Sequence, residues 1–164
     1  MIHHISIPAK DPQRVARVIA ELWQGEALPF PPFPDSYIVI AGDDHGTAIE
    51  VAPLGLELMP GQKMEEVQPK LNAAASQFTT THAALSTPLS EARIKEIAAR
   101  EGWRAETFDR GPAFRLVEFW VENRLLLEFL PPNMVQRYLD AMKPHRYTEL
   151  FGLELPQEQE QLVA

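Results

Sequence analysis

The sequence predicts an α+β fold of two βαβββ modules, in which a helix covers one face of each sheet and leaves the other face free to line a cavity. Short apolar runs typical of strands surround one amphipathic helix pattern, and this order occurs twice along the chain. A histidine opens each copy and a glutamate lies in its last strand run, as His4 with Glu50 and His82 with Glu128. The same number of residues separates the members of each pair, and each glutamate has a proline three positions later. Such self-similarity indicates an internal repeat.

The first module is expected over residues 1–53. A strand over 1–8 is followed by Asp11 and Pro12, which predict a helix start because aspartate caps free amide groups and proline already has a helical φ. Gly25 is expected to close this helix in the left-handed conformation. Alternating apolar residues then predict three strands, at 27–30, 37–41 and 47–52.

The second module is expected over residues 78–132 and repeats the same order. A strand over 81–86 precedes Thr87 and Pro88, which are expected to form the cap and first turn of a helix that stops at Gly102. Three strands are predicted after it, at 104–109, 114–121 and 125–130.

Three segments lie outside the modules. The proline-rich stretch Phe30–Pro34 predicts a stiff loop at the mouth of a pocket. Residues 54–77 form a long connector, expected to pack across the surface or to pass between subunits. Residues 133–164 are expected to form a helix capped by Asn133, which ends before Pro144, and then a frayed polar tail over 157–161.

Composition limits the classes of partner. The 164 residues are 45% hydrophobic and 23% charged, as in globular proteins. A net charge of −8 without a run of lysine or arginine argues against nucleic acid and anionic membranes, and favours a small-molecule substrate. The absence of cysteine excludes disulfides and thiolate chemistry. No pattern of a signal peptide or a membrane span is present, so we expect a cytoplasmic protein.

The repeated histidines and glutamates are candidate metal ligands. Strand alternation places Glu50 on the face of its small neighbours Ala48 and Ala52, and His4 on that of Ser6. A carboxylate in an apolar strand costs several kcal/mol unless a charge compensates it, and a dication bound by both glutamates would do so. Mixed nitrogen and oxygen donors suit nickel, zinc, iron, manganese or cobalt rather than calcium. Three other histidines are expected to be structural or exposed: His3, His45 and His145.

The motifs that carry these residues resemble those of the vicinal oxygen chelate superfamily, which includes glyoxalase I, bleomycin resistance proteins and extradiol dioxygenases. The resemblance covers about residues 1–131 and rests on His-His-Ile-Ser-Ile-Pro-Ala-Lys-Asp, Ala-Ile-Glu-Val-Ala-Pro, Thr-His-Ala-Ala-Leu and Leu-Leu-Glu-Phe-Leu-Pro-Pro. It implies that the two βαβββ modules form a curved mixed sheet shaped as a cup, which holds a divalent metal ion. The implied ligands are His4, Glu50, His82 and Glu128.

With all four positions filled, the resemblance implies a metal-dependent lyase or isomerase similar to glyoxalase I. Its substrate would be a small molecule with vicinal oxygens that passes through an enediolate-type intermediate. One glutamate would act as the catalytic base, and we favour Glu128, with Glu50 as its symmetric rival.

Two alternatives stay open at this point. The first is a binding protein of the bleomycin-resistance type, which sequesters an antibiotic or metabolite and needs no complete ligand set. The second is an iron-dependent extradiol-type dioxygenase that uses His4, His82 and Glu128, in which Glu50 would be a surplus ligand. The cup can be completed within one chain or across a homodimer, and the long connector favours the dimer.

Overall fold

A computed structural model of the chain describes residues 2–63 and 65–154. Its first four-stranded sheet has the order β1-β4-β3-β2, in which β1 and β4 are parallel and the other pairs are antiparallel. The elements of this unit are β1 (His4–Ala9), α1 (Pro12–Trp23), β2 (Glu26–Pro29), β3 (Tyr37–Ile40) and β4 (Ala48–Pro53).

The second sheet repeats this topology with the order β7-β10-β9-β8, and again only its first pair of strands is parallel. The predicted α+β class with two similar modules is therefore confirmed. In the described chain the strands of the two modules form two separate mixed sheets, and each of these begins at a free edge, β1 or β7. The elements of the second unit are β7 (Ala83–Ser86), α2 (Glu91–Glu101), β8 (Arg104–Asp109), β9 (Arg115–Val121) and β10 (Leu125–Leu130).

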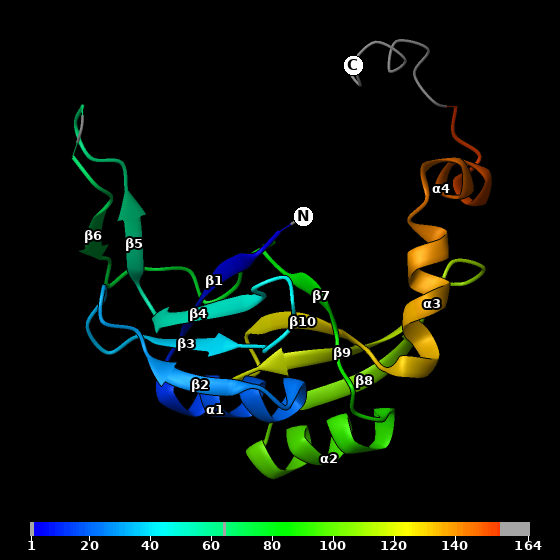
Figure 1. Cartoon of the computed structure of the whole chain (residues 1–164), viewed down its shortest axis with the longest axis horizontal. Coiled ribbons are helices and arrows are strands. Elements are labelled where there is room, and N and C mark those ends of the chain that lie inside the picture. The colour runs from blue at the N-terminus through cyan, green and yellow to red at the C-terminus, as the bar shows by residue number, and fades with distance from the viewer. Residues whose placement is uncertain (1, 64, 155–164) are drawn as a thin grey trace.

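The two helices α1 and α2 lie together on one side of both sheets (Figure 1). One continuous apolar core fills the space between them, and it includes Ile19 of α1, Ile97 of α2 and Phe119 of β9, all fully buried. Phe119 packs edge-on against Phe129 at 5.5 Å between ring centroids, a favoured aromatic geometry. The opposite face of each sheet is left for the candidate site.

Two arms rise from opposite sides of this body (Figure 1). One is the antiparallel hairpin of β5 (Leu56–Met59) and β6 (Gln68–Leu71), which lies in the connector. The other consists of α3 (Pro132–Ala141) and α4 (Pro144–Phe151). None of the described helices has the length and apolar character that a membrane span needs.

The residues predicted to start or end the helices were confirmed in some places and wrong in others. The Asp11 side chain accepts a hydrogen bond from the Arg14 amide at 3.0 Å, and Gly102 ends α2 with φ 73°. The first helix, however, ends on a left-handed Gln24 rather than on Gly25. Gly25 is needed for close packing, because a Cβ there would lie 2.3 Å from the Ile40 carbonyl oxygen.

Three other expectations were wrong in detail. Ser90, not Thr87, caps α2, and the Thr87 hydroxyl instead donates to the Leu22 carbonyl at the end of α1. Asn133 lies inside α3, which begins at Pro132 without a side-chain cap. Pro144 starts α4 rather than following the last helix. The predicted polar tail lies outside the described residues.

A buried arginine joins the two modules. Arg124, in the turn between β9 and β10, is only 5% exposed. Its guanidinium donates to the Pro8 carbonyl at 2.9 Å and to the Gln77 carbonyl at 3.0 Å. The end of β1, the connector and the second sheet are thereby held by one charged group.

We expect Arg124→Ala to lower the free energy of unfolding by about 2–3 kcal/mol, because hydrogen bonds from a charged donor are lost and two carbonyls lose their partner. Chemical denaturation monitored by circular dichroism measures this change. Arg17→Ala is the control, since Arg17 is exposed and its side chain bonds only within α1, and less than about 0.5 kcal/mol is expected. Equal stability of the two variants would contradict the role of Arg124.

Candidate metal site

The first histidine and glutamate lie on neighbouring parallel strands. In the β1–β4 register Ser6 is opposite Glu50, and His4 is two residues before Ser6 on the same face. His4 Nε2 lies 3.7 Å from Glu50 Oε1, while the Ser6 hydroxyl donates to Glu50 Oε2 at 2.7 Å. The carboxylate side chain is 16% exposed and the imidazole 59%. One oxygen of Glu50 is therefore fixed by a neutral donor, and the other faces the histidine.

The second pair repeats this arrangement. His82 directly precedes β7, and its Nε2 lies 3.9 Å from Glu128 Oε2 on β10. His82 Nδ1 lies 3.0 Å from the Thr80 carbonyl oxygen, which can only accept, so Nδ1 carries the hydrogen. In the neutral ring the lone pair is then on Nε2, the nitrogen that lies 3.9 Å from Glu128 Oε2. A hydrogen bond on the far nitrogen is the usual way in which a metal-binding histidine is oriented.

Glu128 also faces a cation that sequence reasoning missed. Arg110 Nη2 lies 3.5 Å from Glu128 Oε1 and donates to Glu118 Oε1 at 2.6 Å. Glu118 is the direct partner of Glu128 in the β9–β10 register, and Trp120 Nε1 donates to its other oxygen at 3.3 Å. Alternation along β9 predicts that Glu118 and Trp120 share a face. The cross-strand register that brings Glu118 to Glu128 has no comparable signal in the sequence.

The described residues of one chain form two pairs and not one cluster of four. Among residues 2–63 and 65–154, no three histidine, aspartate or glutamate side chains lie close enough to hold one metal ion. His4 and His82 do line the same groove, of about 750 Å³, between the free-edge strands β1 and β7. Convergence of all four donors on a single ion stays a prediction.

Each pair by itself has a geometry that suits a cation. Donors bound to one ion at about 2.1 Å each can lie no more than about 4.2 Å apart. The two nitrogen–oxygen distances meet this limit, and neither is short enough for a good hydrogen bond. Two neutral imidazoles and two carboxylates would balance the charge of one divalent ion.

The remaining histidines have other surroundings. His3 Nδ1 bonds the carbonyl oxygen of His45 at 2.6 Å, which ties the start of the chain to the turn before β4. His145 lies in α4 and is exposed.

Comparison with solved structures places this arrangement in a known fold. The chain matches the fosfomycin resistance protein FosX from Listeria monocytogenes, complexed with Mn(II) and sulfate, with a TM-score of 0.53 and 14% identity over 85% of this chain and 94% of that chain. It also matches a glyoxylase/bleomycin resistance protein/dioxygenase domain from Frankia sp. EAN1pec, with a TM-score of 0.50 and 13% identity over 80% and 96% of the two chains. The sequence matches no protein-family model and no curated protein.

These likenesses concern the fold. The chain has the glyoxalase-like fold that its motifs predicted, with two sheets of the same topology.

Proposed function

We propose that the protein is a metal-dependent lyase or isomerase that acts on a small molecule with vicinal oxygens. The observation that carries the proposal is the duplicated pair, in which each histidine Nε2 lies within 4 Å of a carboxylate oxygen on the same sheet. Together His4, Glu50, His82 and Glu128 offer a donor set for nickel, zinc, iron, manganese or cobalt. The Mn(II) in the related FosX structure supports a divalent ion in this fold.

We further propose that the donor set is completed in a symmetric homodimer. One chain presents two half-sites, and β1 and β7 both have a free edge. In a two-fold dimer, the first module of one copy meets the second module of its partner, so that two equal sites form. Apolar side chains exposed on the two arms offer the surface that such contact would bury: Met59, Val67, Leu71, Tyr147, Phe151 and Leu153.

The chain's own residues supply the proton transfer. When bound, a divalent ion polarises the substrate oxygens and makes the adjoining C–H more acidic. Glu128, the favoured base, takes this proton, and the electron pair of the broken C–H bond forms the C=C bond of an enediolate. Return of the same proton to the neighbouring carbon, together with transfer of the hydroxyl proton to the other oxygen, gives the isomer and restores the carboxylate. Glu50 is the rival for this role, and Ser6 and Arg110 hold the second oxygens of Glu50 and Glu128.

Elemental analysis of protein purified without a histidine tag tests the metal assignment. We expect about one divalent ion per chain, its loss on chelation, and its absence from His4→Ala at the same metal concentration. His145→Ala is the matched control because His145 lies in α4, outside both pairs. A wild-type protein that binds no divalent ion even after supplementation would contradict the proposal.

Reaction assays of the metal-loaded protein then distinguish the chemical classes. Two conversions of methylglyoxal without oxygen uptake support the proposed reaction. With a thiol, the product is the lactoyl thioester, which is the isomer of the hemithioacetal. Without a thiol, the product is lactate, which is the isomer of methylglyoxal hydrate. Oxygen consumption with a catechol would favour the extradiol-type dioxygenase. Tight binding of a small molecule that is recovered unchanged would favour the binding protein.

A further inference from the structure

A second cavity opens on the same face of the first sheet, at the end of β4 beyond Glu50. It has a volume of about 210 Å³ and lies between β1, β4, the start of β5 and the loop before β3. The Ser6–Glu50 hydrogen bond lies in its wall. Glu50 therefore has His4 on one side and this cavity on the other.

The wall of the cavity is mostly apolar, with Ser6, Ser36 and Glu50 as its polar residues. Of the residues that the structure describes, Glu50 is the only ionisable one that lines it, and one of its oxygens accepts from Ser6. The apolar lining comes from four elements or loops and consists of Ile7, Pro8, Phe30, Phe33, Ala52, Leu56 and Leu58. An anionic group placed there would lose its water and be repelled by the Glu50 carboxylate, and a cationic group would compete with the proposed metal ion for Glu50. An apolar group would gain by burial.

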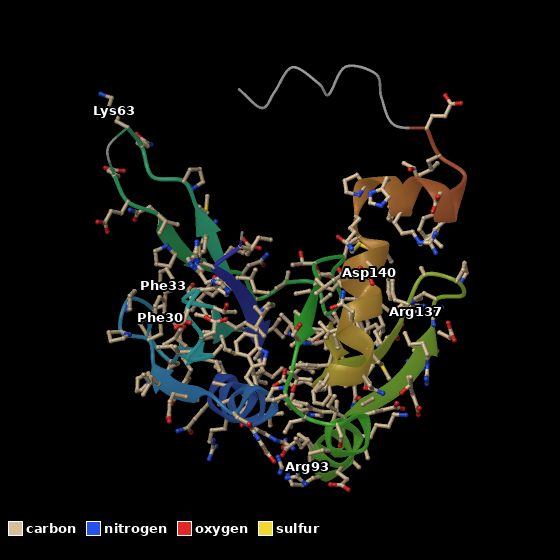
Figure 2. All side chains as sticks on the ribbon, turned by 45° about the vertical axis from the view of Figure 1, so that its right-hand side comes forward. Phe30, Phe33, Lys63, Arg93, Arg137 and Asp140 are labelled. Carbon is tan, nitrogen blue, oxygen red and sulfur yellow. The ribbon has the colours of Figure 1, made fainter. Side chains whose placement is uncertain are left out.

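Prolines and hydrogen bonds within the loop make the segment that carries Phe30 and Phe33 rigid. It contains three prolines, and the Phe30 amide donates to the Ser36 carbonyl at 2.9 Å. Ser36 is buried, and its amide donates to the Phe33 carbonyl at 3.3 Å. The rings of Phe30 and Phe33 pack with centroids 5.8 Å apart, at the base of the β5–β6 arm (Figure 2). The wall is thus formed before any ligand arrives.

We infer that this cavity is a subsite for an uncharged apolar group of the substrate, of the size of a phenyl ring or a branched alkyl chain. A cavity of about 150 Å³ already holds a benzene ring, so the available volume suits such a group. The group would be attached to the carbon skeleton that carries the vicinal oxygens. This inference rests on the proposed function for the position of those oxygens, and on the cavity for the apolar group.

Two neutral diols test the subsite without turnover. Both 1-phenylethane-1,2-diol and propane-1,2-diol have vicinal oxygens, and they differ in carrying a phenyl or a methyl group. We expect the phenyl compound to bind the wild-type protein about 10- to 30-fold more tightly, in both the metal-free and the metal-loaded state. Titration followed by protein-detected NMR measures both dissociation constants.

Two substitutions act on the cavity in different ways. Ala52→Leu places a larger side chain inside it and is expected to abolish the preference for phenyl, while Phe33→Ala removes part of its wall and is expected to reduce the preference about 5- to 10-fold. Phe78→Ala is the control, because Phe78 is 67% exposed just after the connector and does not line the cavity, and the preference should persist. Thermal melting shows which variants are folded, and metal content should equal that of the wild type.

The outcomes separate the subsite from the metal site. A phenyl preference that persists in both cavity variants, or that is absent from the wild type while metal still binds, overturns the subsite. A phenyl preference that depends on Ala52 and Phe33 in a protein that binds no metal supports the subsite and contradicts the proposed function.

Discussion

Glu128→Gln is expected to weaken divalent-metal binding by at least about 100-fold, because a charged ligand becomes a neutral amide in a site that depends on two carboxylates. Glu118→Gln is expected to cost about tenfold, since Glu118 reaches the site only through Arg110. Equilibrium dialysis followed by elemental analysis measures both effects. The order of the two variants tests whether Glu128 is the ligand and Glu118 its support.

Glu106→Gln provides the matched control for this series. Glu106 is the register partner of Glu118 on β8, on the same face of the same sheet, and it is exposed. Its replacement removes an equal charge from the surface and should leave metal binding within about twofold, because exposed charges are screened by salt. Similar losses in all three variants would mean that the net charge of this face, rather than a ligand, controls metal binding.

The sequence specified the fold where short-range signals decide the structure. Strand alternation and two clear cap or stop signals, at Asp11 and Gly102, predicted the repeated βαβββ order. The errors at Gln24 and Thr87 have a common cause, since in both places a contact with another element outweighed the local preference. Gly25 packs against the Ile40 carbonyl, and the Thr87 hydroxyl bonds the end of α1.

The sequence also predicted part of the candidate site, namely which residues share a sheet face. The alternation of side chains along a strand places His4 on the same face as Ser6. It also places Glu50 and Glu128 on the sheet faces turned away from the helices. The buried Ile7 and Phe129, which lie on the opposite faces, agree with this placement. The Arg110–Glu118 contact was not predictable, because it depends on how β9 pairs with β10. The hairpin in the connector was also missed, since its strands are short and exposed and so lack the apolar alternation of a buried strand.

Mixing two half-site variants is expected to restore metal binding that neither has alone. The first variant is His4→Ala/Glu50→Gln, and the second is His82→Ala/Glu128→Gln. If each site combines the first module of one chain with the second module of its partner, neither homodimer has a complete donor set. The heterodimer, however, has one site with all four native donors and one with none. Random exchange of subunits in an equal mixture gives about half heterodimers, so about a quarter of the wild-type metal should return.

Native mass spectrometry confirms that heterodimers have formed, and equilibrium dialysis measures the metal that the mixture binds. Each variant taken through the same exchange alone is the control and should bind no more than before. The test distinguishes a site shared between two chains from a site within one chain, because the second arrangement gives the opposite result. If both pairs of one chain closed on a single ion within that chain, every chain in the mixture would lack half of its ligands. Heterodimers without recovered metal would therefore place the site within one chain and refute the shared site.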